Sequence, residues 1–230
     1  MKIIAKIYTD FKEKFGIPRQ SGIVGTVGRI VFEPEYRRDE ATRGIDGYSH
    51  LWLIWCFSEA EREEWSPTVR PPRLGGNKRI GVFATRSPFR PNPIGLSSVR
   101  LLGIERLEGL GLTLLVSGAD ILDGTPIYDI KPYLAYTDSH PDAIGGFADG
   151  VREYEVEVRM SDELANILSK EERETITELL RQDPRPSYKG ECDREYGMVY
   201  GRWEVFFTAE GDAIRVTRIE SKGSNLSGRC

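Results

Sequence analysis

The sequence predicts a mainly β fold, a barrel or a sandwich, followed by a smaller α+β region, and three observations support this prediction. Short apolar runs rich in β-branched and aromatic residues recur through the first 140 residues, with turn residues between most of them. Helical spacing of apolar residues replaces that pattern after Pro141. No G-x-G-x-x-G run follows a strand and no P-loop run occurs, which argues against a Rossmann or P-loop domain. We therefore expect one domain over residues 1–145, a second over 146–222 and a flexible polar tail at 223–230.

The strands of the first region are expected where apolar, β-branched or aromatic runs have strand length. They cover residues 3–8, 23–32, 51–57, 80–85, 98–104, 112–119 and 125–134. Turns are expected at Gly47, Gly75–Gly76, Gly111 and Gly124. The one helical pattern in this part, at residues 59–65, is weak. Many short strands with few helices are typical of a barrel or a sandwich.

The second region combines strands with an amphipathic helical stretch. Residues 152–160 alternate Tyr154, Val156 and Val158 with charged residues, which predicts a half-exposed strand. Ser161 and Ser169 are expected helix N-caps, and a glutamate three residues after Ser169 completes a capping box. Apolar residues then follow at helical spacing: Leu164, Ile167, Leu168, Ile176, Leu179 and Leu180. Two more strands are expected at 199–207 and 213–219, joined by a turn at 210–212.

Composition and cysteine usage restrict the class of protein. The three cysteines, Cys56, Cys192 and Cys230, are widely spaced and form no C-x-x-C pair. This pattern argues against a disulfide framework or a zinc site and favours a reducing cytoplasm. Charges interrupt the first fifteen residues, so we expect neither a signal-peptide core nor a membrane span. Only His50 and His140 are histidines, too few for a histidine-built metal site, and we expect no metal, although Mg²⁺ held by carboxylates alone stays open.

The segment 80–97, IGVFATRSPFRPNPIGLS, is the most informative for function. It has neither a helical nor a sustained strand period. Each of its three prolines fixes φ and restricts the preceding residue, so residues 87–93 are expected to form a stiff, extended loop. Arg86, Arg90 and Asn92 are hydrogen-bond donors set into that loop. A loop that is ordered in advance and carries guanidinium groups suits an anionic or polar ligand.

Charge is distributed unevenly around this segment. No Asp or Glu occurs between Trp65 and Ile104, whereas the whole chain has a formal net charge of −4. A basic patch in an acidic protein indicates a local anionic partner such as phosphate or nucleic acid. The alternative is a solvated Arg-rich loop whose charges pair with acidic neighbours. The basic residues of the patch are Arg70, Arg73, Lys78, Arg79, Arg86, Arg90 and Arg100.

A second group of polar residues follows the strand expected at 112–119. Asp120, Asp123 and Asp129 lie at a strand end, a turn and the next strand. Turn chemistry explains the Asp123–Gly124 pair on its own. Carboxylates also accept hydrogen bonds from amino groups and ribose hydroxyls, and aromatic faces stack on bases. The segment supplies both kinds of group, because it also contains Tyr128, Lys131, Tyr133 and Tyr136.

Five blocks of the chain together resemble one known family. They read IPRQSG, DGYSHLWLIWCF, RPPRLGGNKRIGVFATRSPFRPNPIGLS, DILDGTPIYDIKPYL and QDPRPSY. In this order they resemble the TrmO/TsaA-like family of tRNA methyltransferases, and the resemblance runs from residue 4 to residue 207. That family transfers a methyl group from S-adenosylmethionine to N6 of threonylcarbamoyl-adenosine at tRNA position 37. The resemblance implies a cytoplasmic homodimer, with a small β-barrel methyltransferase domain that is not Rossmann and a cofactor site near the subunit interface.

The resemblance also implies where the ligands bind. The family often has a His-Gln pair where this chain has Ser58–Glu59. The implied cofactor residues are Pro18, Arg19, Gln20, Ser58, Glu59, Arg86, Leu96, Asp120, Ile121, Leu122 and Asp123. The tRNA candidates combine the acid-free segment with the QDPRPSY block: Lys78, Arg79, Arg90, Asn92, Arg185 and Tyr188.

The chemistry of the transfer suggests the catalytic candidates. The target nitrogen is a weak nucleophile, so transfer needs near-attack geometry and removal of the N–H proton. Carboxylates favour a cationic sulfonium, and one could act as the base. Asp129, Lys131, Pro132 and Tyr133 are distantly similar, with one residue too many, to the D-P-P-Y loop of DNA adenine methyltransferases. Asp129 and Tyr133 are therefore the catalytic candidates.

The same residues bear on two other classes of function. A non-catalytic regulatory protein that binds S-adenosylmethionine or RNA would use the same loop and stays open. A phosphoryl-transfer enzyme would need metal-binding carboxylates at the Arg-rich loop, and that loop contains none.

Overall fold

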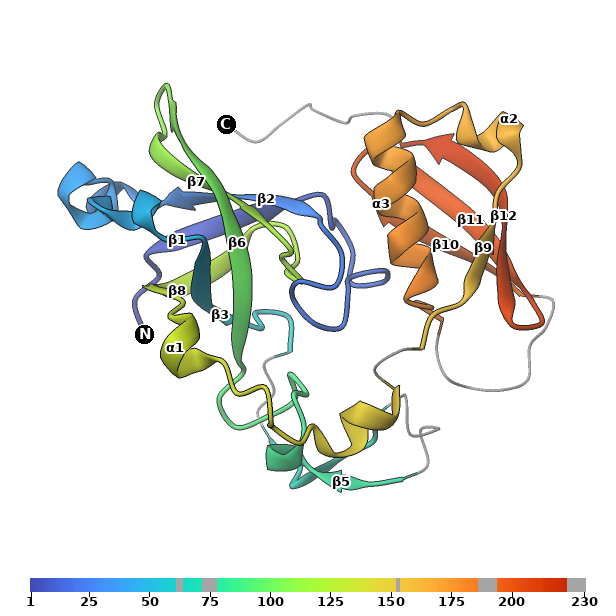
Figure 1. Ribbon diagram of the computed structural model, residues 1–230, viewed down its shortest axis with the longest axis horizontal. Helices are drawn as coiled ribbons and strands as arrows, with labels where there is room; N and C mark the ends of the chain where they lie inside the picture. Colours follow the sequence, from blue (N-terminus) through green and yellow to red (C-terminus); the bar gives the residue numbers. More distant parts are fainter. Residues whose placement is uncertain (61–63, 72–77, 152–153, 186–193, 223–230) are drawn as a thin grey trace.

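A computed structural model describes residues 1–60, 64–71, 78–151, 154–185 and 194–222. Six antiparallel strands pair in the order β1-β2-β7-β6-β3-β8, and β8 pairs again with β1. The sheet is therefore a closed barrel, seen on the left of Figure 1. Its strands are β1 (Ala5–Thr9), β2 (Val27–Phe32), β3 (His50–Cys56), β6 (Ile94–Leu107), β7 (Gly111–Ser117) and β8 (Thr125–Pro132).

Alternation along the strands fills the barrel. On β3, Leu51, Leu53 and Trp55 are buried, whereas Trp52 and Ile54 between them are half-buried. Apolar side chains at alternate positions of a strand point to one face, so the same pattern on each strand makes one shared interior. The other strands contribute Ala5, Ile7, Ile30, Val99, Leu114, Val116 and Ile127 to this core. The predicted mainly β class is confirmed.

Three strands of this region differ from the prediction by more than two residues. The strand expected at 23–32 begins only at Val27, because the preceding residues turn and Gly22 donates its N–H to the Gly118 carbonyl at 2.9 Å. The strand expected at 98–104 is part of the longer β6, because Ile94 already pairs with Cys56. The strand expected at 80–85 is wrong after its second residue. There β5 (Ile80–Gly81) pairs with β4 (Thr68–Val69) in a separate two-stranded sheet, and the 3-10 turn Val82–Ala84 follows.

Short helices connect the barrel strands. The 3-10 turns Pro34–Tyr36, Asp39–Thr42 and Ile45–Gly47 lie between β2 and β3, α1 (Ala135–Asp138) follows β8, and Gly146–Val151 precedes the second region. The described residues of the segment 59–65 contain no helix. Residues 61–63 and the turn predicted at Gly75–Gly76 lie outside the described residues. No helix among the described residues is long and apolar enough to span a membrane.

The second region is a four-stranded sheet with helix α3 packed on it (Figure 1). The sheet order is β10-β11-β12-β9, with β9 parallel to β12. A capping box at Ser169 begins α3, as predicted. The elements are β9 (Glu157–Arg159), α2 (Asp162–Ala165), α3 (Lys170–Arg181), β10 (Glu195–Tyr200), β11 (Trp203–Glu210) and β12 (Ala213–Ser221).

Two predictions for this region are wrong in extent. The single strand expected at 199–207 is two strands, β10 and β11, because a tight turn at Gly201, with φ +58°, reverses the chain. The strand expected at 152–160 is reduced to β9, since Val156 instead donates its N–H to the Arg181 carbonyl at the end of α3. Residues 152–153 and the tail predicted to be flexible, 223–230, lie outside the described residues. The division of the chain at residue 145 stays a prediction.

Residues 10–25, which we call the arm, join the two regions. The arm leaves the barrel after β1 and returns to it at β2, and between these strands it packs on the C-terminal sheet (Figure 1). Phe11 is 1% exposed and lies in the C-terminal core, with its ring centroid 5.5 Å from that of Tyr200. Phe15 stacks on Phe207 at 6.3 Å. Because aromatic burial dominates core energetics, the C-terminal region holds the arm in place.

Candidate functional site

A cavity of about 880 Å³ lies where the barrel, the arm and the Arg-rich loop meet. We call residues 85–93 the Arg loop. Nine of the predicted cofactor residues line the cavity: Pro18, Arg19, Gln20, Ser58, Glu59, Arg86, Leu96, Asp120 and Leu122. Arg90 and Asn92, predicted to contact tRNA, line it as well. Motifs that lie far apart in the sequence thus form one wall, and the volume is in the range of small-molecule sites.

A hydrogen-bonded chain of three side chains forms the inner wall of the cavity. Trp55 donates its indole N–H to Ser97 Oγ at 3.0 Å, and Ser97 donates to Asp120 Oδ1 at 2.6 Å. Gly95 pairs with Trp55 across β3 and β6, and a Cβ at Gly95 would overlap the Trp55 ring. Glycine therefore lets the indole lie against β6 and reach Ser97. Sequence reasoning missed Trp55, Gly95 and Ser97, although a glycine inside a strand was a usable signal.

Asp120 has an unusual electrostatic environment. Burial raises the pKa of Asp120 above its usual range, while the hydrogen bond from Ser97 and the Arg86 charge oppose that rise. The other carboxylate of the described cavity wall, Glu59, forms an exposed ion pair with Lys14 at 3.0 Å. Asp120 has no such ion pair among the described residues. It is therefore the wall carboxylate that is set to respond to a bound cation or a proton.

The arm is fixed to three neighbours at the cavity. Gln20 accepts a hydrogen bond from the Arg86 guanidinium through its side-chain oxygen. Ser21 Oγ accepts the Ser98 N–H of β6 at 3.2 Å, and Arg19 donates to the Asp183 carbonyl at 3.2 Å. The arm thus connects the Arg loop, the barrel and the C-terminal region at one point.

Asp183 is buried, and polar side chains at the surface hold its carboxylate. Its φ is +48°, which is uncommon for a non-glycine residue. Its carboxylate accepts Arg185 Nε at 2.6 Å, Arg185 Nη2 at 2.9 Å and the Tyr154 hydroxyl at 3.1 Å. Burial alone would raise the pKa of Asp183, but the Arg185 guanidinium, the Tyr154 hydroxyl and the Arg185 backbone N–H together outweigh it and the pKa is lowered. Arg185, predicted to contact tRNA, therefore braces the residue that holds Arg19, whereas Tyr188 lies outside the described residues.

The Arg loop contains neither helix nor strand, but it bends at several residues and is not extended as predicted. Arg90 Nη1 donates to the carbonyls of Thr85 at 3.1 Å and Ser87 at 3.5 Å. Ser87 Oγ accepts the Phe89 N–H at 3.2 Å. The loop is therefore braced by its own side chains, with one nitrogen of Arg90 used for that purpose.

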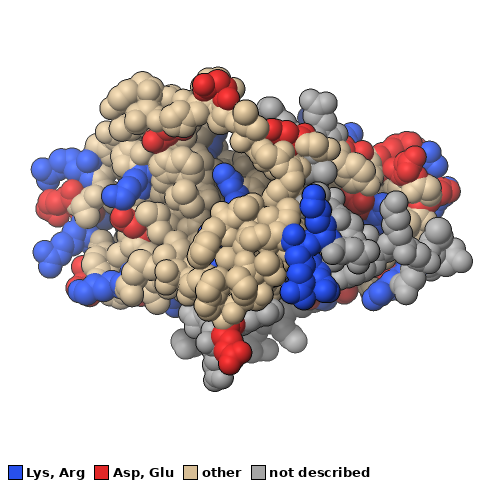
Figure 2. Space-filling model, turned by 90° about the horizontal axis from the view of Figure 1, so that it is seen from below, with Lys and Arg blue, Asp and Glu red and all other residues tan. Residues whose placement is uncertain are grey.

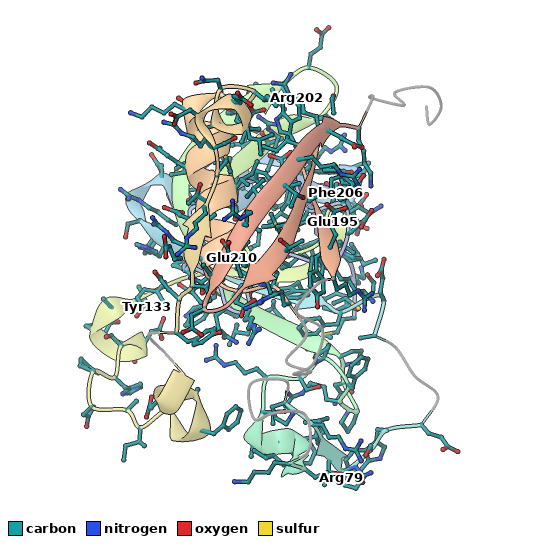
Figure 3. The ribbon with its side chains drawn as sticks, turned by 90° about the vertical axis from the view of Figure 1, so that its right-hand side faces the viewer. Arg79, Tyr133, Glu195, Arg202, Phe206 and Glu210 are labelled. Carbon is teal, nitrogen blue, oxygen red and sulfur yellow. The ribbon has the colours of Figure 1, made fainter. Side chains whose placement is uncertain are left out.

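The remaining predicted residues lie outside the cavity wall. Asp129 is half-exposed and pairs with Lys131 at 3.5 Å. Tyr133, labelled in Figure 3, has its ring centroid 5.4 Å from that of Trp52. Asp123 and Gly124 form a turn, in agreement with the turn interpretation, and Gly124 has a φ of +76°. The Asp123 carboxylate accepts the Thr9 N–H at 2.9 Å and pairs with Lys12 at 2.7 Å.

The rest of the predicted set is placed as follows. Ile121 is fully buried in the barrel core. Lys78 and Arg79 are exposed next to β5. The described residues contain no group of three or more His, Cys, Asp or Glu side chains placed to hold a metal ion.

The fold and the site together define a class of protein. It is a β-barrel protein whose ligand-sized cavity combines aromatic walls, guanidinium groups and one half-buried carboxylate without an ion pair among the described residues, and whose second region holds part of the cavity wall. Two family models match this chain: the tRNA-methyltransferase O N-terminal domain over residues 6–139 and the TrmO C-terminal domain over residues 153–222. The chain belongs to the TrmO family.

Individual relatives agree with the family models. The tRNA (adenine(37)-N6)-methyltransferase of Escherichia coli strain K12 is 43% identical over 208 residues, which are 87% of each chain. The tRNA (adenine(37)-N6)-methyltransferase of Eikenella corrodens is 49% identical over 164 residues, or 71% of this chain and 92% of the relative. The crystal structure of TrmO from Pseudomonas aeruginosa is similar with a TM-score of 0.75 and 35% identity. That match covers 95% of this chain and 97% of the other.

Proposed function

We propose that this protein methylates N6 of threonylcarbamoyl-adenosine at position 37 of tRNA, with S-adenosylmethionine as the methyl donor. The observation that carries the proposal is the cavity whose inner wall presents Asp120 beside aromatic side chains. The names of the relatives supply the reaction, and the convergence of the arm, the Arg loop and Asp120 on one cavity supports it. A non-catalytic binding protein is the less favoured alternative.

The chemistry of the cavity wall fits S-adenosylmethionine. This molecule supplies a methyl group attached to a cationic sulfonium, together with an adenosine and a carboxylate. The aromatic faces of Trp52 and Trp55 suit a cation or an adenine ring, and Arg86 suits a carboxylate. The half-buried Asp120 carboxylate is stabilised in its charged form when a cation binds beside it. The residues that would hold the cofactor are Pro18, Arg19, Gln20, Ser58, Glu59, Arg86, Leu96, Asp120 and Leu122.

In the transfer, the N6–carbon bond forms as the carbon–sulfur bond breaks, and the N6 proton must leave. Asp120 is the wall carboxylate without an ion pair among the described residues, and its raised pKa makes it a better proton acceptor than an ordinary aspartate. Trp55 and Ser97 orient this carboxylate. We therefore assign the proton transfer to Asp120, and Asp129 becomes the alternative that the experiment tests.

The substrate contacts follow from the position of the cavity. Arg90 and Asn92 at its rim would contact the modified nucleotide, and Lys78 and Arg79 would contact the tRNA backbone. Arg185 and Tyr188 are proposed as a second contact from the C-terminal region. We further propose a cytoplasmic homodimer that needs no metal.

The test measures methyl transfer and cofactor binding in two matched variants. Asp120→Asn is expected to lower kcat at saturating S-adenosylmethionine by about 100-fold or more, because a positioned base contributes that much. Asp129→Asn is expected to keep kcat, because Asp129 lies outside the cavity wall. Mass spectrometry of tRNA carrying the threonylcarbamoyl group measures the product, and Asp142→Asn, an exposed aspartate, is the control.

Each outcome has a meaning. Loss of kcat in Asp129→Asn alone would return the base to Asp129. Normal kcat in Asp120→Asn, with weaker cofactor binding, would leave Asp120 only the ground-state role of balancing the sulfonium charge. Cofactor binding without any mass gain on tRNA by the wild type would favour the regulatory protein.

A further inference from the structure

The hairpin formed by β4 and β5 carries two exposed aromatic side chains that the cavity does not use. Thr68 pairs with Gly81, and Val82 donates its N–H to the Pro67 carbonyl at 2.9 Å. Just beyond these pairs, the ring centroids of Trp65 and Phe83 lie 6.0 Å apart with a 34° angle between their planes. Trp65 and Phe83 therefore form one aromatic surface across the two strands of the hairpin.

This aromatic surface is open to solvent. Trp65 is 52% exposed and Phe83 is 73% exposed, whereas the adjacent Val82 is 1% exposed. The hairpin thus has one face packed on the protein and another that presents aromatic rings. Figure 1 shows it projecting at the bottom of the molecule, away from the C-terminal sheet. Exposed large apolar groups side by side are an informative exception on a soluble protein, and they indicate a binding surface.

The other end of the hairpin is basic. Arg70 directly follows β4, and Lys78 and Arg79 directly precede β5. All three are exposed, and none forms an ion pair among the described residues. In the C-terminal sheet, by contrast, Arg159 and Arg215 both pair with Glu210. In Figure 2, basic side chains stand on a largely uncharged face, and Figure 3 labels Arg79 at the tip of this part of the molecule.

We propose that Trp65 and Phe83 stack on an unpaired base of the substrate RNA, while Arg70, Lys78 and Arg79 bind its backbone phosphates. The proposal rests on the proposed function only for the choice of RNA. Proteins commonly bind single-stranded nucleic acid with aromatic faces and cations together, since every base has a face that can stack on an aromatic ring. Arg79 directly precedes β5 and Phe83 lies in the 3-10 turn after it, so the cations and the rings lie at the two ends of one short strand.

A second copy of the chain fits this surface less well. A two-fold contact places the same patch of both copies face to face, so it would bring two sets of unpaired cations together. Like charges that meet in this way are unfavourable, whereas phosphates neutralise them.

The experiment compares Phe83→Leu, Phe83→Tyr and the control Phe147→Leu, which makes the same change at an exposed phenylalanine outside the hairpin. The probe is an anticodon stem-loop RNA that carries the modified adenosine. Phe83→Leu keeps apolar bulk but removes the aromatic face, so its Kd for the RNA is expected to rise about fivefold or more. Phe83→Tyr and Phe147→Leu are expected to stay within about twofold. Affinity for S-adenosylmethionine and kcat at saturating RNA are expected to be unchanged in all three.

Further readouts separate the possible failures. If Phe83→Leu fails to fold, Trp65→Phe tests the stacking role in its place. This variant keeps an aromatic ring, so its RNA affinity is expected to be unchanged, but it is expected to lose part of the tryptophan fluorescence change on RNA binding. An unchanged RNA Kd in Phe83→Leu, or an unchanged fluorescence response in Trp65→Phe, overturns the stacking role while methyl transfer stands. A change of oligomeric state without a change in RNA Kd overturns it in favour of a contact between copies. Weaker RNA binding by Phe83→Leu, with no transfer by the wild type, keeps this proposal and removes the proposed reaction.

Discussion

Ser97→Ala tests the chain of hydrogen bonds behind the cavity. Ser97 is 1% exposed and serves two partners, since it accepts from Trp55 and donates to Asp120. Alanine fits the same space but provides neither bond. The buried indole N–H of Trp55 then has no acceptor, which costs about 1–3 kcal/mol. For a protein of this size, that cost lowers the Tm by roughly 2–12 °C.

The pH dependence distinguishes this effect from a simple loss of stability. The pKa of Asp120 is raised in the folded state, so folding opposes its ionisation, and this contribution to stability falls as pH rises from the unfolded pKa through the folded one. Ser97 opposes the rise, so Ser97→Ala raises the pKa of Asp120 further. The stability difference between variant and wild type is therefore expected to be smallest at acid pH, where Asp120 is protonated in both, and largest at neutral pH.

Calorimetric unfolding and titration with S-adenosylmethionine from about pH 3 to pH 8 measure both consequences. Under the proposed function the ionised Asp120 carboxylate balances the sulfonium charge, so in Ser97→Ala the pH at which cofactor affinity appears is expected to move upward. Ser117→Ala, a half-buried serine at the end of β7, is the matched control. A Tm loss that is equal at every pH, together with an unshifted binding profile, would refute the coupling between Ser97 and Asp120.

Two further predictions concern the C-terminal region and the hairpin. Asp183→Asn removes the negative charge that pairs with Arg185 and weakens the support of the carbonyl that binds Arg19. We expect the free energy of unfolding to fall by roughly 2 kcal/mol and cofactor affinity to fall as well. Because the pKa of Asp183 is lowered, its stabilisation is present above the unfolded pKa and is lost as pH falls through the folded pKa. Denaturant curves of variant and wild type should therefore converge in acid. Lys78→Ala and Arg79→Ala should each reduce the salt dependence of log Kd for tRNA by about one unit, and unchanged slopes would locate phosphate binding elsewhere.

The sequence predicted which residues line the cavity better than it predicted the contacts that hold those residues in place. Pro18, Arg86 and Asp120 lie in three separate polar motifs, and the structure brings all three motifs to one cavity. What the sequence could not show is which neighbours fix them. The hydrogen bond from Arg19 to the Asp183 carbonyl joins residues far apart in the chain, and no local pattern encodes such a contact. Nor could strand runs alone reveal that β8 pairs back to β1 and closes the sheet.

The position of Asp129 shows why a period of two misleads across an irregular strand. Thr125 and Ile127 are buried, so strict alternation would place Asp129 on the same inner face. The pairing with β3 shifts at this point: Ile127 lies opposite Trp55, but Asp129 lies opposite Ile54, so β8 has one residue more than β3 between these two pairs. An extra residue of this kind exchanges the two faces of the strand beyond it. Ile130, opposite the buried Leu53, now packs on the core, and Asp129 lies on the other face beside Lys131. One inserted residue therefore separates Asp129 from the barrel interior, which makes Asp120 the carboxylate to test first.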